Sequence, residues 1–239
     1  VREIAQTARE AGFEEDGPPG TGKKFFSVNK DRSVALALIG QAPLAEGLRI
    51  IVSHIDSPRI DLKQNPLYED ADMALLRTHY YGGIKKYQWV TIPLSLHGLI
   101  VKADGSSLNL VIGEDEEDPV FVINDLLPHL SGKAQDSKKI TEAIEGKKLT
   151  LLAGSLPFPD PDAKERVKLR IMELLHQKYG LVEEDFTSAE LELVPAMKAR
   201  DVGFDRSLIG SYGQDDRASA YTSLHALLSV TEPPRTAIV

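Results

Sequence analysis

Two apolar runs near the N-terminus constrain the fold most. The stretches "SVALALIG" (residues 33–40) and "LRIIVSHID" (residues 48–56) carry apolar side chains at consecutive positions. A strand with one solvated face alternates apolar and polar side chains, whereas a strand covered on both faces carries a continuous apolar run. The two runs therefore predict strands that are buried on both faces of an α/β sheet.

The centre of the chain has a different character. The stretches "IPLSLHGLIVK", "SLNLVIG" and "PVFVIND" are shorter apolar runs separated by turns such as "ADGSS", and "SAELELVPA" predicts a further strand. This pattern is typical of an antiparallel sheet. The stretch "KERVKLRIMELLHQKYG" predicts an amphipathic helix that ends at Gly180. Its predicted apolar face comprises Val167, Ile171, Leu174 and Leu175.

Both ends of the chain predict α/β elements. "VREIAQTAREAGF" predicts a helix, "FFSVN" a strand, "GSYGQDDRASAYTSLHALLSV" a loop that leads into a helix, and "TAIV" the start of a buried strand. An α/β domain interrupted by an insertion would have this order. We expect residues 1–65 and 200–239 to form the α/β domain and residues 66–199 to form a β-rich insert.

Charge and composition exclude several classes of protein. Hydrophobic residues make up 42% and charged residues 27% of the 239 positions, as in soluble globular proteins. The net charge of −8 disfavours nucleic acid and anionic membranes as partners, and the lack of cysteine excludes disulfides and thiolate metal sites. Because no apolar run reaches membrane-span length and no signal-peptide pattern is present, we expect a cytoplasmic protein.

The stretch "GPPGTGKK" (Gly17–Lys24) resembles the start of an ATPase phosphate-binding loop. That loop needs Ser or Thr after its Lys, on a turn from a buried strand into a helix. Here Lys24 replaces the hydroxyl residue, "AGFEED" before the loop is not an apolar strand, and "FFSVN" after it predicts a strand instead of a helix. We therefore expect a Gly/Pro turn, and a nucleotide-binding protein remains only as an alternative.

Residues suited to metal binding follow one of the apolar runs. In "IIVSHIDSPRID" the run ends and presents His54, then Asp56 two positions later. Imidazole is a common ligand for zinc and related metals, and a nearby carboxylate can orient the ring. Sites in open α/β sheets also form beyond the carboxyl ends of strands. The alternative is a histidine at a strand end and an aspartate that begins a turn before Pro58.

A second candidate lies just before the last predicted helix. In "GQDDR" the adjacent Asp215 and Asp216 have a structural explanation, because acidic residues cap helix N-termini and complement the helix dipole. A carboxylate can also bridge two cations with its two oxygens. His54 and Asp215 alone are too few to hold two metals, because a catalytic zinc usually has three protein ligands.

Five longer stretches, which occur in the same order as in a known family, favour the metal-binding interpretation of these residues. "SHIDSPRIDLKQNPLYE", "THYYGGIKKYQW", "DPVFVINDLLPHL", "SAELELVPA" and "SYGQDDRASAYTSL" together resemble the aspartyl aminopeptidase and aminopeptidase I family of dinuclear zinc metallopeptidases. The resemblance implies a zinc-peptidase α/β domain, a mixed sheet with helices, interrupted by an inserted dimerisation domain. It also implies a cytoplasmic homo-oligomer that removes N-terminal residues from peptides.

The resemblance also implies roles for individual residues. His54 would ligate one of two divalent metal ions, expected to be zinc, Asp56 would be a catalytic residue that supports that site, and Asp215 would bridge the metals. Asp216 is a weaker candidate, because that position varies in relatives. His129, in "DLLPHL", is similar to a histidine that reaches the active site of a neighbouring subunit, although by itself it fits a turn residue after Pro128.

This chain lacks one part of the family's catalytic machinery. In the family, the strand after the helix of the bridging aspartate leads to two adjacent glutamates, of which one is the general base. Here "TAIV" corresponds to the start of that strand, so we expect a chain that is truncated at its C-terminus, lacks the general-base glutamate and is inactive alone. The alternative from another class is a non-catalytic oligomerisation scaffold built from the β-rich insert, in which His54 and Asp215 would bind no metal.

Overall fold

The chain forms two compact units. The computed structural model describes residues 1–17 and 22–239. The first unit combines Val1–Ser57 with Gly213–Val239, and the second is the continuous segment Pro58–Tyr212. The predicted boundaries, 65/66 and 199/200, both lie inside the second unit. They differ from the observed ones because strand β5 (Arg59–Asp70) is continuous across residue 65, and its first residues already pair with β6 (Met73–Tyr81).

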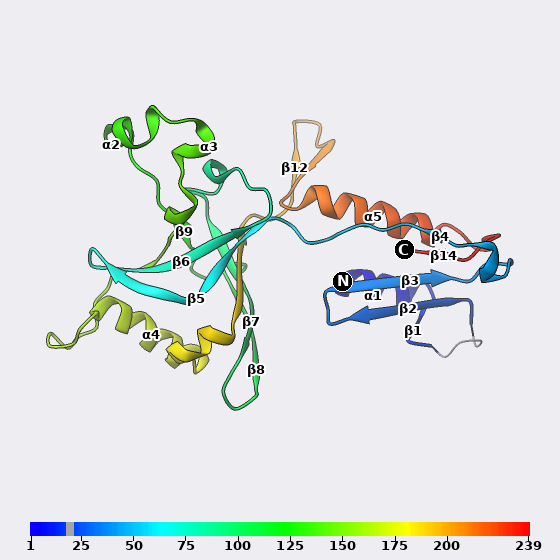
Figure 1. Ribbon diagram of the computed structural model, residues 1–239, viewed down its shortest axis with the longest axis horizontal. Helices are drawn as coiled ribbons and strands as arrows, with labels where there is room; N and C mark the ends of the chain where they lie inside the picture. The colour runs from blue at the N-terminus through cyan, green and yellow to red at the C-terminus, as the bar shows by residue number, and fades with distance from the viewer. Residues whose placement is uncertain (18–21) are drawn as a thin grey trace. The chain divides into compact units, whose positions relative to one another are not determined.

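The first unit is a mixed sheet with two helices (Figure 1). Its elements are α1 (Arg2–Glu10), β1 (Glu14–Glu15), β2 (Lys24–Asn29), β3 (Ser33–Leu38), a 3₁₀ turn (Leu44–Glu46), β4 (Arg49–Ile50), α5 (Gln214–Leu228) and β14 (Ala237–Ile238). The strand order is β1-β2-β3-β14-β4, in which β14 runs antiparallel to β3 and parallel to β4. The predicted α/β class is therefore confirmed, and "TAIV" does contribute a strand.

Both helices of the first unit pack against its sheet through one apolar core. α1 contributes Ala5 and Ala8, and α5 contributes Leu224 and Leu227. The strands contribute Phe26, Leu36 and Leu38 to the same cluster. Because β2 and β3 come from the first segment of the unit and α5 comes from the second, this core holds together two segments that are far apart in the sequence.

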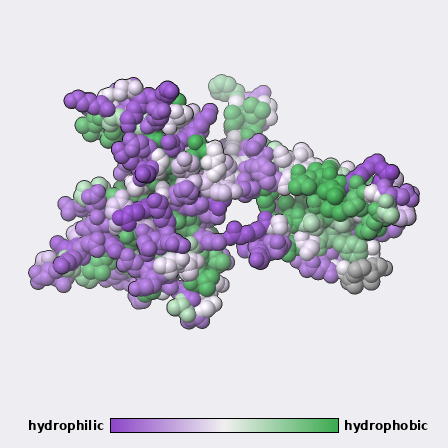
Figure 2. All heavy atoms as spheres, in the orientation of Figure 1, coloured by the Kyte–Doolittle hydropathy of each residue, from purple (hydrophilic) through white to green (hydrophobic). Residues whose placement is uncertain are grey.

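The prediction that both apolar runs form strands buried on both faces is wrong. The first run does form β3, but only Leu36 and Leu38 are buried in it and Ala35 is exposed. In the second run β4 spans only Arg49–Ile50, and the apolar residues around it are exposed, with exposed fractions of 58% for Ile50, 46% for Ile51 and 86% for Val52. β4 is the edge strand and pairs with β14 alone among the described strands. Apolar surface is accordingly visible over the first unit in Figure 2.

The second unit is built on a seven-stranded antiparallel sheet of order β8-β7-β11-β5-β6-β10-β9 (Figure 1). Besides β5 and β6, its strands are β7 (Leu94–Val101), β8 (Ser107–Ile112), β9 (Val122–Ile123), β10 (Leu151–Gly154) and β11 (Glu190–Pro195), with a separate hairpin of β12 (Arg200–Val202) and β13 (Leu208–Gly210). Its helices are α2 (Pro128–Ser131), α3 (Ile140–Ala143) and α4 (Arg166–Tyr179), with short 3₁₀ or π turns at Lys86–Gln88, Gly132–Asp136, Gly146–Lys148 and Glu183–Ser188. The predicted antiparallel character of this region is confirmed.

Helix α4 forms where its periodicity predicts, and Gly180 ends it in the left-handed conformation. Val167 is buried, and Ile171 and Leu175 pack against the core of the seven-stranded sheet. Leu174 is 43% exposed, so its predicted place on the buried face is wrong.

Among the described residues, no helix combines the length and the apolar character that crossing a bilayer requires.

Candidate metal centre

His54 and Asp56 lie on an extended segment between β4 and β5, within the first unit. The segment begins immediately after β4, where the Ile51 backbone N–H donates to the Ile238 carbonyl of β14 at 2.9 Å. The strand therefore ends four residues before His54, earlier than the apolar run predicts. The His54 side chain is 65% exposed and that of Asp56 is 56% exposed, so both are accessible to a ligand from solvent.

Asp215 and Asp216 lie in the first turn of α5, as expected for acidic residues at a helix start. Gly213 precedes the helix with a φ of +72°, a conformation that side-chain-bearing residues rarely adopt. The turn leaves Asp215 exposed and buries Asp216, which is only 3% exposed. The two neighbouring carboxylates therefore occupy different environments.

The structure brings His54, from the segment after β4, close to Asp215 and Asp216 at the start of α5. Asp216 Oδ1 lies 2.9 Å from His54 Nδ1, and Asp56 Oδ1 lies 3.5 Å from the same nitrogen. One ligand atom from each of His54, Asp215 and Asp216 lies within 4.8 Å of the other two. Of the described residues, these three form the group of histidine and acidic side chains that is close enough to share a metal ion.

The donor set of this group fits zinc. It offers one imidazole nitrogen and carboxylate oxygens, which are ordinary zinc ligands. Two of the three residues are exposed, so an ion could enter and retain a position for another ligand. Asp56, close to the imidazole, is placed to influence the ring without being part of the group.

His129 lies outside this group, whereas Ser57 contacts one of its members. His129, predicted to reach a neighbouring site, is exposed in the short helix α2 of the second unit and does not belong to the His54 group. Ser57 was missed by sequence reasoning, although its hydroxyl donates to Asp216 Oδ2 at 2.6 Å. No sequence pattern signals this contact, because it joins positions that become neighbours only in the folded unit.

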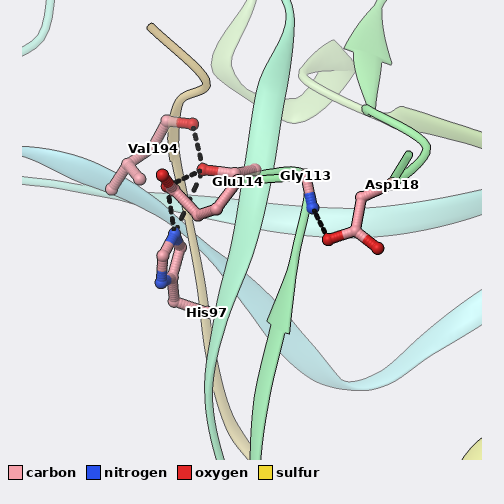
Figure 3. A network of polar contacts seen from close by, with 6 residues as sticks. His97, Gly113, Glu114, Asp118 and Val194 are labelled. Carbon is pink, nitrogen blue, oxygen red and sulfur yellow. Dashed lines mark hydrogen bonds and ion pairs between the residues drawn. The ribbon is translucent and has the colours of Figure 1, made fainter. Parts of the chain in front are cut away.

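A second polar cluster lies in the second unit and has a different geometry (Figure 3). Glu114 Oε1 lies 2.9 Å from His97 Nε2 and accepts from the Ser95 hydroxyl at 3.1 Å, while Ser95 Oγ and His97 Nε2 are themselves 3.1 Å apart. Serine and glutamate thus approach the same imidazole nitrogen, unlike a catalytic triad, in which they approach opposite nitrogens. Ser95 is also fully buried, so this cluster attaches the start of the acidic Glu114–Asp118 loop to β7.

Half of the loop that resembles a phosphate-binding sequence, residues 18–21 of Gly17–Lys24, lies outside the described residues. The strand predicted after it is confirmed, because β2 begins at Lys24. The Lys24 ammonium donates to the Ala11 carbonyl at 2.9 Å and lies 5.5 Å from the centre of the Phe13 ring. Lys24 is therefore engaged in contacts within the first unit.

A family model and individual relatives both match this chain, and they agree on its family. The family model described as "Aminopeptidase I zinc metalloprotease (M18)" matches residues 3–238. A probable M18 family aminopeptidase 1 of Clostridium acetobutylicum is 51% identical over 245 residues, which cover 100% of this chain and 52% of that protein. Its counterpart in Thermotoga maritima is 48% identical over 232 residues, which cover 96% of this chain and 50% of that protein. The chain spans about half the length of these curated relatives.

Solved structures agree with the sequence comparison. The crystal structure of an M18 family aminopeptidase from Thermotoga maritima matches with a TM-score of 0.90 at 46% identity, over 100% of this chain and 52% of that one. Aminopeptidase I from Clostridium acetobutylicum matches with a TM-score of 0.90 at 48% identity, over 100% of this chain and 54% of that one. The sequence motifs, the mixed α/β fold and these matches lead to one conclusion: the chain belongs to the aminopeptidase I (M18) family of zinc metallopeptidases.

Proposed function

We propose that this chain supplies part of the dinuclear zinc site of an aminopeptidase that removes N-terminal residues from peptides. The observation that carries the proposal is the convergence of His54, Asp215 and Asp216 within 4.8 Å in a chain of this family. The chain spans about half the length of its curated relatives, so the activity, the peptide substrates and the partners all belong to the proposal.

The proposed ligands are His54 and Asp215. His54 would bind one ion through Nε2, since its Nδ1 faces the Asp216 and Asp56 carboxylates. Asp215 would bridge the two ions, because its exposed carboxylate at the start of α5 has two oxygens to offer. Asp56 would limit the orientations that the imidazole can adopt, as carboxylates beside metal-bound histidines commonly do.

When bound, a metal pair supplies Lewis acidity that activates water and polarises a scissile carbonyl. The chain's own contribution is to hold two ligands, from a loop and from a helix start, in fixed positions on one unit. A hydrolase of this kind also needs a general base that takes the proton from water and passes it to the leaving amine. In the family that the sequence motifs resemble, this role belongs to a glutamate that follows the strand to which "TAIV" corresponds.

The two units would have different roles, one in catalysis and one in assembly. The first unit would be the metallopeptidase part, because it carries His54, Asp56 and Asp215. The second unit would be the inserted dimerisation domain of a cytoplasmic homo-oligomer, in which His129 would serve the site of a neighbouring subunit. Its exposed position in α2 leaves His129 accessible for such a contact.

Zinc titration of the chain by calorimetry tests the proposed ligands. We expect His54→Ala and Asp215→Ala each to raise the dissociation constant for zinc at least about 10-fold, because losing a residue that only orients a ligand already costs about 10–100-fold in metal affinity. His225→Ala is the matched control, because His225 lies in the same helix as Asp215 and its ring contacts Tyr221. The control should bind zinc as the unaltered chain does.

Peptidase activity is measured in a form of the protein that has the length of its relatives. His54→Ala and Asp215→Ala should nearly abolish the release of N-terminal residues in that form, whereas His225→Ala should leave it intact. A His54→Ala protein with a full complement of zinc and normal turnover would show that the metal site lies elsewhere.

A further inference from the structure

The hairpin of β12 and β13 carries large apolar side chains at its surface. Val202 and Leu208 are directly opposite partners in the two strands, so their side chains project from the same face, and both are exposed. Phe204, in the turn between the strands, is fully exposed. None of these three belongs to either apolar core of the part of the chain that the structure describes. Figure 2 accordingly shows apolar surface over this hairpin.

The hairpin forms a two-stranded sheet of its own, separate from the seven-stranded sheet of the second unit (Figure 1). An isolated two-stranded hairpin is only marginally stable in water unless something packs against it. Apolar side chains gathered on an exposed element commonly mark a surface that binds another protein or a membrane. The hairpin therefore has the features of a docking element.

A hollow beside the hairpin is large enough to receive an aromatic side chain. Its volume is about 560 Å³, and pockets of about 300–1,000 Å³ hold drug-sized ligands. The hollow is lined by Ala199, Arg200, Asp201, Gly203, Arg206 and Ile209. Guanidinium groups such as those of the two arginines attract the faces of aromatic rings. The hairpin thus presents both an uncovered ring, that of Phe204, and a hollow that suits one.

The presence of both features on one hairpin favours a second copy of this chain as the partner. In a two-fold contact each copy presents the same surface, so the ring of one copy can fill the hollow of the other, and the reverse. The charges are also self-complementary, because residues 200–210 carry two basic side chains, Arg200 and Arg206, and two acidic ones, Asp201 and Asp205. An anionic membrane would favour a basic surface, whereas this hairpin is balanced and the chain has a net charge of −8.

We propose that the β12–β13 hairpin is a self-association arm, in which Phe204 of each copy enters the hollow of the other. This inference rests on the proposed homo-oligomer and assigns a contact surface to it. Within one copy, Arg206 Nη1 and Asp201 Oδ2 lie 3.9 Å apart and both side chains are largely exposed. Such a pair contributes little to stability, so both groups can exchange it for an opposite charge on the second copy.

Sedimentation equilibrium of the chain over a range of concentrations measures the self-association. We expect the unaltered chain to associate and Phe204→Ser to raise its dissociation constant about 30-fold or more, the loss usual for a central aromatic anchor. Phe204→Tyr retains the ring and should keep most of the affinity. Because Phe204 is fully exposed, Phe204→Ser should unfold at the same temperature as the unaltered chain, which shows that the loss does not come from misfolding.

Leu156→Ser is the matched control. Leu156 is an exposed apolar residue of the same unit that lies outside the hairpin. If general stickiness of exposed apolar residues caused the association, this variant would weaken it as much as Phe204→Ser does, and the proposal would be wrong. We expect the dissociation constant of Leu156→Ser to equal that of the unaltered chain.

The remaining outcomes separate this proposal from the proposed function. An oligomer whose dissociation constant is the same with and without Phe204→Ser refutes the hairpin contact and leaves the homo-oligomer standing, whereas a chain that is monomeric at every concentration refutes both. If Phe204→Ser leaves self-association intact but abolishes sedimentation with vesicles of phosphatidylcholine and phosphatidylserine, the hairpin binds membranes and the proposal is wrong. Zinc titration of Phe204→Ser should match that of the unaltered chain, so the metal site is judged independently of the hairpin.

Discussion

Replacing Gly40 with alanine should detach β14 from its neighbours in the first unit. Gly40 follows β3, and a Cβ atom there would lie 2.3 Å from the carbonyl carbon of Arg235 and 2.4 Å from the backbone nitrogen of Thr236. Both are backbone atoms, so no side-chain rotation relieves the overlap. Because carbon atoms make their best contacts at about 3.5 Å, the segment before β14 must retreat by about 1 Å.

The cost of this retreat follows from the hydrogen bonds that cross the contact. Three backbone N–H groups donate across it: Gly40 to Thr236 Oγ1 at 3.0 Å, Gln41 to the Pro233 carbonyl at 3.1 Å, and Ala42 to the Pro234 carbonyl at 2.9 Å. A retreat of about 1 Å takes all three beyond hydrogen-bonding distance. At about 1 kcal/mol each, Gly40→Ala should lower the free energy of unfolding of the first unit by about 3 kcal/mol.

Amide hydrogen exchange gives a local measurement of this effect. The backbone N–H groups of Arg49 and Ile51 donate to the carbonyls of Thr236 and Ile238, each at 2.9 Å, so their protection reports whether β14 and β4 stay paired. Gly40→Ala should abolish most of that protection. It should also weaken zinc binding, because the chain runs from β4 to His54.

Gly22→Ala is the control for this experiment. A Cβ atom at Gly22, in the same unit, would meet its nearest neighbour only at 3.8 Å, so this variant should keep the protection of the unaltered chain. A Gly40→Ala protein whose protection and unfolding free energy stay within about 0.5 kcal/mol of the unaltered chain would refute the steric argument.

Three further outcomes are expected. Asp56→Asn should lower turnover more than zinc content in a form with the length of the relatives, because a residue beside a ligand orients it without replacing it; equal losses of both would contradict this. Leu193→Ala, at a fully buried position of β11, should cost about 2–5 kcal/mol of unfolding free energy in a urea titration, whereas Leu174→Ala, at a 43% exposed position, should cost less than about 1 kcal/mol. Hydrogen bonds from the Ser106 hydroxyl and backbone N–H lower the pKa of Asp104. These bonds therefore stabilise the turn at pH values above the ordinary pKa of the carboxyl, and the stabilisation is lost as the pH falls through the lowered pKa. Ser106→Ala should raise the pKa of Asp104 in an NMR titration, and an unchanged pKa would count against the hydroxyl as the main cause of the shift.

Local patterns predicted the elements that local interactions determine. Helix α4 has its apolar stripe and its terminal Gly180, and both act within the helix itself. The strands β8 and β11 have the alternation of more and less buried positions that one buried face imposes. Leu174 was misplaced because a stripe gives the direction of burial but not its width, which depends on what packs beside the helix.

Long-range pairing explains what the sequence did not reveal. The longest strand, β5, contains Pro66 and several polar residues, and its pairing register with β6 shifts between Leu62 and Leu67, so it shows no regular alternation. The apolar run that contains β4 is exposed because neighbours, not residue type, determine burial. The pairing of Asp216 with His54 and Ser57 likewise depends on where α5 begins relative to a loop far away in the sequence.

The position of β14 between β3 and β4 has a consequence for synthesis on the ribosome. Residues 1–57 leave the exit tunnel before residues 213–239, yet β3 and β4 have no pairing with each other and must wait for Ala237 and Ile238 to join them. Meanwhile the edge of β3 and the apolar side chains around β4 stay uncovered, which is the condition under which nascent chains aggregate or recruit chaperones. The continuous second unit has no such wait, so it should fold first and shorten the loop that the two segments of the first unit must close.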